Sequence, residues 1–376
     1  MTSAAPIAFA VAAQLAIAAP RGDAWSVAGL GGIRGVTVGP IENGYHPGVG
    51  YGSPAYDRTL AEAHAMGATW VALTPYGRVG DLSGAGVDVT FEAPFERNRR
   101  DMERAVAMAH ARGLRVMIVP HLWVESGQWH GEIDPGSDAG WTQWAASYTR
   151  FVSAWARVAE AARADMFSAG VELRTWVTTT HGPSFTRLLR EVRRVYHGLL
   201  TYSANWDDAD QAVVLGDVDI IGINGFYPLA DAAGATEASM VDHARAIRDK
   251  VHALATSWGK PVLFTEIGYT TRTDPALKPW LWPDAMSDVK VDEAAQATAY
   301  RALIEPMLDE PDFAGFFVWR MYADPDDTSQ EAPWGFSPRG KQAELVVRDA
   351  FAAQWACDPW WHRAWGDAAR TAGIYP

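Results

Sequence analysis

Short runs of apolar residues alternate with longer amphipathic stretches along most of the chain. The apolar runs are nearly continuous instead of alternating with polar positions, which is typical of parallel strands covered on both faces. They predict eight strands, at residues 35–38, 69–74, 115–120, 166–171, 200–203, 219–224, 261–265 and 315–319.

The stretches between these runs repeat their apolar residues with the period of a helix. Strands that alternate with helices indicate an α/β fold, and eight such units predict a single (β/α)8 TIM barrel over residues 21–353. The fifth unit leaves room for only a short helix, at residues 207–215. The expected helices lie at residues 56–66, 95–112, 141–164, 185–197, 240–257, 293–308 and 341–352.

Two of the predicted strands end on a glutamate. Glu172 closes the run Met166-Phe-Ser-Ala-Gly-Val-Glu172, and Glu266 closes Pro261-Val-Leu-Phe-Thr-Glu266. A charge at the end of a buried strand costs several kcal/mol unless it is paired. A salt bridge from Glu172 to Arg174 or Arg320 is one explanation. The other is a pair of carboxyl groups that does acid–base and nucleophilic chemistry at the open face of the barrel.

The other predicted strand ends carry amides, aromatic residues and a histidine. His121 could also be a core histidine, and Trp319 could also be a core residue. Trp282 and Trp334, in the loops after the last two strands, are expected walls of a cleft. We expect the substrate-binding residues at the strand ends to be Tyr76, His121, Trp123, Asn205, Trp206, Asn224, Tyr227 and Trp319.

The amino-acid composition limits which classes of molecule the protein is expected to bind. The net charge of −13 argues against nucleic acid and against an anionic membrane, whereas a neutral polysaccharide is indifferent to it. Eighteen tryptophans are typical of proteins that stack indole rings on sugars. The alternative is that tryptophans fill the large core, which we expect for about half of them. The single cysteine, Cys357, excludes an intrachain disulfide and a cysteine-based metal site. A zinc site using Glu125 and His130 has the wrong spacing, so we expect no metal.

Three segments together resemble the clan A glycoside hydrolases. They are Gly170-Val-Glu172-Leu, Ile223-Asn-Gly-Phe-Tyr-Pro228 and Phe264-Thr-Glu266-Ile-Gly-Tyr269. Within the clan the chain looks most like glycoside hydrolase family 113, whose known members are largely enzymes that hydrolyse β-1,4-mannan. The resemblance implies a retaining enzyme without a cofactor, with Glu172 as acid/base and Glu266 as nucleophile. We expect Tyr227 to donate a hydrogen bond to that nucleophile.

One residue departs from the clan pattern. Many clan members have an asparagine directly before the acid/base, where it contacts the sugar 2-hydroxyl, but this chain has Val171. Asn205 or Asn224 is expected to make that contact instead. An axial 2-hydroxyl, as in mannose, is compatible with the change.

The same residues leave several functions open. The machinery could act on a β-glucan or a β-galactan, work as an exo-β-mannosidase, or remodel polysaccharides by transglycosylation. A catalytically silent glycan-binding barrel is the alternative from another class. Two glutamates at the strand ends argue against it, because a binding protein does not need both.

The two ends of the chain add expectations about export and packing. Residues 1–20 resemble a signal peptide, although no lysine or arginine precedes the apolar stretch. This segment favours a secreted or periplasmic location over a cytoplasmic one. It is too short and alanine-rich for a transmembrane helix. The tryptophan-rich tail at residues 354–376 is expected to pack across the base of the barrel, and the protein to be a monomer.

Overall fold

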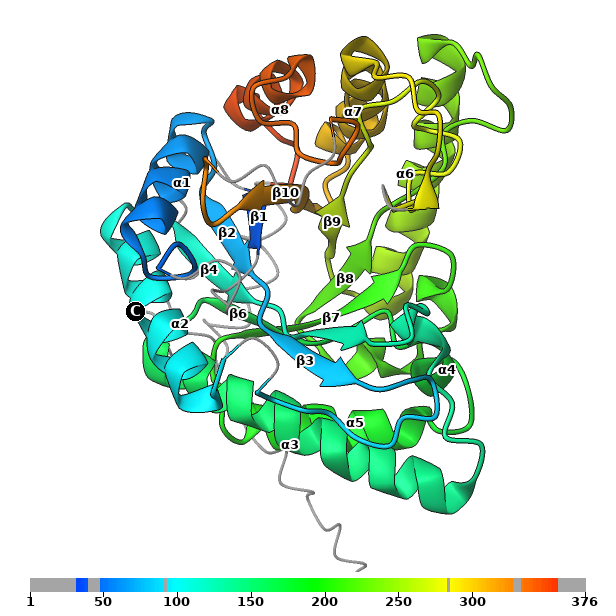
Figure 1. Cartoon of the computed structure of the whole chain (residues 1–376). Coiled ribbons are helices and arrows are strands. Elements are labelled where there is room, and N and C mark those ends of the chain that lie inside the picture. Colours follow the sequence, from blue (N-terminus) through cyan, green and yellow to red (C-terminus); the bar gives the residue numbers. More distant parts are fainter. Residues whose placement is uncertain (1–31, 40–47, 91–92, 283–284, 327–332, 358–376) are drawn as a thin grey trace, which may run out of the picture.

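The computed structural model describes residues 32–39, 48–90, 93–282, 285–326 and 333–357 (Figure 1). At its centre eight parallel strands close into a barrel, in which β1 hydrogen bonds to both β2 and β10. The predicted (β/α)8 barrel is therefore confirmed. The strands are β1 (Ile33–Gly39), β2 (Trp70–Leu73), β4 (Arg115–Ile118), β6 (Met166–Val171), β7 (Leu199–Asn205), β8 (Ile220–Asn224), β9 (Val262–Ile267) and β10 (Phe313–Tyr322).

Helices surround the barrel on its outside (Figure 1). The connection from β7 to β8 holds only two short 3-10 helices, at Ala209–Gln211 and Val213–Asp217. The sequence left room for no more than a short helix in this fifth unit. A four-residue helix, α4 (Arg174–Val177), follows β6 directly. The longer helices are α1 (Pro54–Ala65), α2 (Phe95–Ala111), α3 (Asp138–Ala162), α5 (Gly182–Arg193), α6 (Glu237–Trp258), α7 (Glu293–Leu308) and α8 (Gln342–Ala352).

Two strands outside the barrel were not predicted. β3 (Tyr76–Val79) follows β2, β5 (His121–Val124) follows β4, and the two pair in parallel. Pro75 and Pro120 lie at the breaks between the barrel strands and these extensions. A proline has no N–H to donate, so it interrupts a strand without stopping the chain from continuing in the same direction. The extension raises one side of the barrel mouth and sets Tyr76 opposite His121.

A buried arginine links β1 to the end of α8. Arg34 is 1% exposed and donates to the carbonyl oxygens of Phe351, at 2.5 Å, and Ala353, at 2.7 Å. Its guanidinium carbon lies 4.1 Å from the centre of the Trp355 ring, which stacks on Phe316. The last carbonyl groups of a helix lack hydrogen-bond partners within the helix, and this arginine supplies donors to them. Its positive charge also interacts favourably with the partial negative charge at the carboxyl end of the helix.

The close approach of β1 and β10 depends on a glycine. Gly315 has a φ of 134°, which side chains of L-residues rarely allow. A β-carbon added there would lie 2.2 Å from the carbonyl oxygen of Ile33. The absence of a side chain at this position therefore lets the first and last strands pair.

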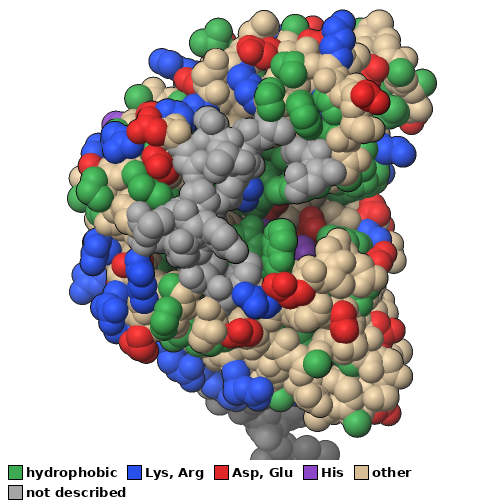
Figure 2. Space-filling view, viewed as in Figure 1, with side chains coloured by type: hydrophobic (Ala, Val, Ile, Leu, Met, Phe, Trp, Pro, Cys, Tyr) green, Lys and Arg blue, Asp and Glu red, His purple; other side chains and the backbone are tan. Residues whose placement is uncertain are grey.

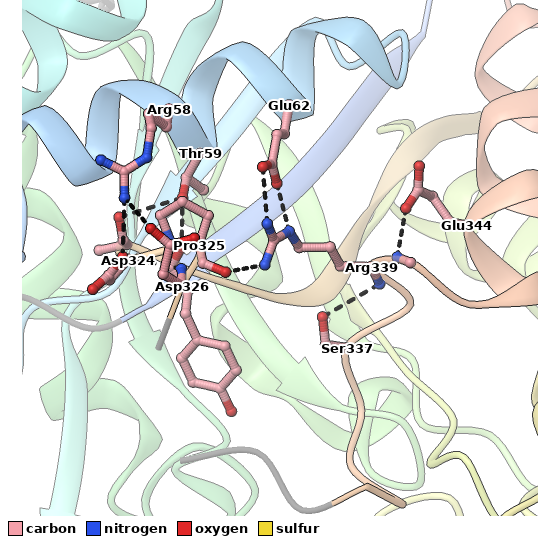
Figure 3. Close-up of polar contacts among 12 residues, drawn as sticks. Arg58, Thr59, Glu62, Asp324, Pro325, Asp326, Ser337, Arg339 and Glu344 are labelled. Carbon is pink, nitrogen blue, oxygen red and sulfur yellow. Dashed lines mark hydrogen bonds and ion pairs between the residues drawn. The ribbon is translucent and has the colours of Figure 1, made fainter. Parts of the chain in front are cut away.

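Polar contacts tie α1 to the segment after β10 (Figure 3). Arg339 makes a two-point contact with Glu62, with N–O distances of 2.5 and 2.9 Å. Arg58 on the same helix donates to Asp326 at 2.6 Å. These contacts fix the segment that carries Phe336, whose ring centre lies 5.5 Å from that of Trp282 at the barrel mouth.

Two predictions about the chain ends fall mostly outside this description. The segment at 1–20 and all of the tail beyond residue 357 lie outside the described residues. Within the described part of the tail, Trp355 and Cys357 are both buried. None of the described helices combines the length and the apolar character that a membrane span requires.

Replacing Trp355 with Ala should lower the free energy of unfolding by about 3 kcal/mol, because the buried indole leaves a cavity beside Phe316 and Arg34. Denaturant unfolding of the purified variant measures the change. Leu345→Ala is the control: Leu345 is 61% exposed, and its loss should cost less than about 0.5 kcal/mol. A loss below about 1 kcal/mol for the tryptophan variant would show that the tail does not pack here in solution.

Candidate active site

The carboxyl ends of four neighbouring strands bring the two glutamates to one face. Asn205 on β7 pairs with Asn224 on β8, and Asn224 pairs with Glu266 on β9. Glu172 directly follows β6, and its N–H donates to the carbonyl of Ser203 on β7 at 2.7 Å. Figure 2 shows that this end of the barrel is hollowed and that acidic and histidine side chains lie in the hollow among hydrophobic ones.

Glu172 is held by two donors, one on each carboxyl oxygen. The indole N–H of Trp129 donates to Oε2 at 2.9 Å, and the amide of Asn224 donates to Oε1 at 3.0 Å. The backbone of Glu172 is left-handed, with a φ of 50°. That conformation costs about 1–3 kcal/mol in a residue with a β-carbon and is characteristic of functional sites. Arg174 does not pair with Glu172; its guanidinium contacts Asp207 and Asp208.

Glu266 faces a histidine and an arginine. Its Oε1 lies 3.3 Å from His121 Nε2, and both side chains are 8% exposed. Arg320 on β10 lies over the rings of Trp319 and Tyr322, and its charge lowers the pKa of Glu266. Asn224, the strand partner of Glu266 on β8, lowers the same pKa. Its amide donates to Glu172, so Asn224 adjoins both of the glutamates.

Burial raises the pKa of both carboxyl groups. The pKa of Glu172 rises to about 7, chiefly through burial and further through the negative charge of Glu266. The pKa of Glu266 rises to about 8, again through burial. Because two adjacent carboxylates cannot both ionise without cost, the pair favours keeping a proton near neutral pH.

Both nearby histidines are neutral. Burial lowers the pKa of His121 to about 4 and that of His130 to about 3. His130 Nε2 lies 3.9 Å from Oε2 of Glu172. The site thus presents two acids and two uncharged imidazoles, a set suited to proton transfer and to hydrogen bonding with hydroxyl groups.

Two groups of aromatic rings lie at this end of the barrel. Tyr76, His121 and Trp319 form a row, with successive ring centres 5.4 and 5.7 Å apart. Trp206, which packs against the cluster that holds Trp319, stacks on Trp280 with ring centres 5.4 Å apart and planes 23° apart. Both arrangements present flat apolar faces of the kind that pack against sugar rings.

Of the predicted binding residues, five lie in these groups, and their contact with a sugar remains a prediction. Tyr76, His121, Trp206, Asn224 and Trp319 lie in the contacts described above. Trp123 is 49% exposed and lies on β5, two residues after His121. Trp282 is 40% exposed and 6.5 Å from the ring of Trp319, whereas Trp334 is half-buried.

Two of the predicted residues make contacts other than those expected. The amide of Asn205 donates to Asp207 at 2.7 Å, so it holds a neighbouring loop. Tyr227 packs edge-on against Trp206, and among the described residues no hydrogen bond joins its hydroxyl to Glu266. His121 occupies the place beside Glu266 that we expected for Tyr227. Glu42 and Asn43, which follow the first predicted strand, lie outside the described residues.

Sequence reasoning missed Trp129, His130 and Trp280. All three lie in loops after strands, and loop positions carry no periodicity that fixes their direction. The fragment Trp129-His-Gly-Glu132 after the third predicted strand combines an indole, an imidazole and a glycine. That combination of residue types was the only sign in the sequence that this loop belongs to the site. The path of the loop, which the sequence does not reveal, places Trp129 and His130 beside Glu172.

One group of described residues could hold a metal ion. His252, Glu310 and Asp312 place their ligand atoms within 4.8 Å of one another. Asp312 directly precedes β10, so this group lies at the opposite end of the barrel from the glutamate pair. His252 already bridges both carboxylates, at 3.2 and 3.0 Å. The group has no part in the site at the barrel mouth.

Comparison with known proteins identifies a family whose model matches this chain and solved structures that share its fold. The model of Glycoside Hydrolase Family 113 matches residues 47–341. The structure of the GH113 β-mannanase AaManA from Alicyclobacillus acidocaldarius, in complex with ManMIm, is 26% identical to this chain, with a TM-score of 0.74. The match covers 86% of this chain and 98% of that one.

More distant structures share the fold. A GH113 β-1,4-mannanase complex is 22% identical, with a TM-score of 0.74 and coverage of 86% of this chain and 100% of that one. A glycoside hydrolase family 5 mannosidase from Rhizomucor miehei is 11% identical, with a TM-score of 0.58 and coverage of 86% and 93%. A comparison with curated proteins gave no match.

Replacing Glu266 with Gln should lower the pKa of Glu172 below about 7, because it removes a negative charge that disfavours the ionised form. Carboxyl carbon NMR of the labelled variant measures this pKa directly. Glu125→Gln is the control, since Glu125 pairs with Arg78 at the outer end of β5. An unchanged pKa in the Glu266 variant would contradict the coupling between the two carboxyl groups.

Proposed function

The chain belongs to glycoside hydrolase family 113, and on that premise we propose that it hydrolyses β-1,4-mannan or a related β-linked glycan with retention of configuration. In this proposal Glu172 is the general acid/base and Glu266 is the nucleophile. The site needs no metal and no organic cofactor for this chemistry.

The observation that carries the proposal is the pair of buried carboxyl groups that adjoin one residue, Asn224. Its amide donates to Glu172 at 3.0 Å, and its partner on the neighbouring strand β9 is Glu266. Retaining enzymes hold their carboxyl groups about 5–5.5 Å apart, whereas inverting enzymes keep about 6.5–9.5 Å to admit a water molecule. Two carboxyl groups that adjoin the same residue favour the shorter spacing.

In the first step Glu172 gives its proton to the leaving oxygen while Glu266 bonds to the anomeric carbon. The proton of the pair must then lie on Glu172. Positive charge that develops on the sugar next to Glu266 favours the ionised form of Glu266, as the charge of Arg320 already does. The negative charge of Glu266 in turn favours the protonated form of Glu172.

In the second step the roles of the two residues change. Glu266 is now esterified to the sugar and carries no charge, so the repulsion that raised the pKa of Glu172 is gone. Glu172 therefore ionises more readily and takes a proton from water as the water oxygen attacks the anomeric carbon. The attack comes from the face that the first leaving group vacated and breaks the ester bond to Glu266, which frees that carboxylate and restores the β configuration.

Two buried polar atoms beside the pair suit sugar hydroxyls. Trp319 Nε1 and His121 Nε2 make no hydrogen bond to a described residue, and the contact of His121 Nε2 with Glu266, at 3.3 Å, lacks hydrogen-bond geometry. Buried polar groups in folded proteins nearly always have partners, so such atoms favour a polar ligand. We assign contacts with the sugar bound next to Glu266 to these two side chains, which replaces our expectation for Asn205.

The family and its structural relatives support mannan as the substrate. AaManA, at 26% identity over most of both chains, is a β-mannanase. Val171 removes an asparagine that in many clan members contacts the 2-hydroxyl, and mannose differs from glucose at that carbon. Both observations favour a mannan over a glucan.

The direct test is to incubate the protein with β-1,4-mannan, β-glucan and β-galactan and with short β-1,4-mannooligosaccharides. We expect soluble mannooligosaccharides from mannan, with the β-anomer formed first in proton NMR. Cleavage of glucan or galactan in preference to mannan would contradict the substrate. A first product of α configuration would contradict retention, and binding without cleavage would show a glycan-binding protein.

Alanine variants separate the two roles. Glu266→Ala should abolish turnover of every substrate, because no residue is left to form the bond to the sugar. Glu172→Ala should still be glycosylated by an aryl glycoside with a good leaving group, and azide should then give a β-glycosyl azide. Equal loss on activated and natural substrates in both variants would show that the roles are assigned wrongly.

A further inference from the structure

We propose that Trp129 is a positioning residue for Glu172: its indole N–H fixes the orientation of the carboxyl group, and Gly131 and Arg174 fix the indole. The proposal rests on the proposed role of Glu172 as acid/base. It adds a residue from a loop outside the barrel strands to the machinery of the reaction.

The two donors to Glu172 come from different elements. Trp129 directly precedes the short turn His130–Glu132, in the loop after β5, and reaches Oε2. Asn224 on β8 reaches Oε1. A carboxyl group held at both oxygens cannot rotate about its last bond without losing a hydrogen bond. Trp129 therefore sets the direction in which Glu172 presents its proton.

The indole is itself held by a charged network. The guanidinium carbon of Arg174 lies 4.6 Å from the centre of the Trp129 ring. Arg174 donates to Asp208 at 2.7 Å and also pairs with Asp207. Asp208 is 4% exposed, so the arginine, whose side chain is 34% exposed, is anchored to a buried carboxylate. A cation held over an indole face attracts it, and more strongly where water is excluded.

A glycine makes room for the ring. A β-carbon on Gly131 would lie 2.4–2.6 Å from three atoms of the Trp129 indole. Any side chain at this position would therefore push the ring from its place. The carbonyl of Gly131 accepts a hydrogen bond from Thr175 on α4 at 3.1 Å, which ties this loop to the turn that follows Glu172.

The hydrogen bond also has a predictable electrostatic effect. A donor to a carboxylate favours the ionised form, and the Trp129 hydrogen bond lowers the pKa of Glu172 against the effects of burial and of Glu266. The other groups that face Glu172 are neutral His121 and His130 and the amide of Asn224. Loss of the indole N–H should therefore raise the pKa of Glu172 while the carboxyl group loses its orientation.

Trp129→Phe tests this idea, because phenylalanine keeps a ring under Arg174 but has no N–H. On mannooligosaccharides we expect kcat to fall about tenfold with KM little changed, since general acid–base catalysis depends on orientation. The alkaline limb of kcat/KM should move upward by about half to one pH unit, as loss of a charge-assisted hydrogen bond implies. Gly131→Ala, which keeps the N–H but displaces the ring, should move the same limb in the same direction.

Trp258→Phe is the matched control, because Trp258 is 37% exposed at the end of α6, and it should leave kcat, KM and the pH profile unchanged. Thermal unfolding of all three variants confirms that they are folded. A rise in KM with an unmoved alkaline limb would show that Trp129 is a wall of the sugar site, and would overturn the proposal.

Carboxyl carbon NMR separates failure of this proposal from failure of the proposed function. If Glu172→Ala retains full activity, Glu172 is not the acid/base, yet Trp129→Phe should still raise the pKa of Glu172. If Glu172→Ala is inactive on natural substrates and Trp129→Phe leaves that pKa and kcat unchanged, the proposed function stands and the positioning role of Trp129 is refuted.

Discussion

Two carboxyl groups buried side by side repel each other, and much of the barrel mouth is arranged around that repulsion. Glu172 and Glu266 both have raised pKa values because burial penalises their charged forms. The donors beside them work against this penalty: Asn224 and Trp129 donate to Glu172, and the charge of Arg320 acts on Glu266. The raised pKa values favour keeping a proton on the pair, which the proposed double displacement requires at its start.

The barrel and the two glutamates could be predicted from the sequence because both depend on local pattern. Near-continuous apolar runs mark strands covered on both faces, and the residue that ends such a run lies at the strand's carboxyl end. Once the barrel closes, its geometry brings Glu172 and Glu266 to the same face without further information. The short fifth unit was predictable for the same reason, since the spacing leaves no room for a full helix.

The contacts around the glutamates were not predictable in the same way. Which of Tyr227 and His121 faces Glu266 depends on the two strand extensions β3 and β5, and the prolines that begin them look like strand ends in the sequence. Asn205 was expected to contact sugar, but a charged loop residue two positions later engages its amide. Trp129 reaches Glu172 across 43 residues of chain, and no periodicity encodes a contact of that kind.

The pairing of β1 with β10 also has a consequence for how the protein is made. The ring of strands is complete only when Ile33 meets Gly315, and Arg34 reaches its acceptor Phe351 across 317 residues. On the ribosome, the first strand must therefore remain without its partner until nearly the whole chain has emerged. Closing a loop this long costs conformational entropy, and the contacts that offset the cost form only after β10 has been made. Newly made chains therefore expose an unpaired edge of β1 for most of synthesis. The pairing that closes the barrel is thus missing from the growing chain, and the open edge that it leaves is a place where aggregation can begin.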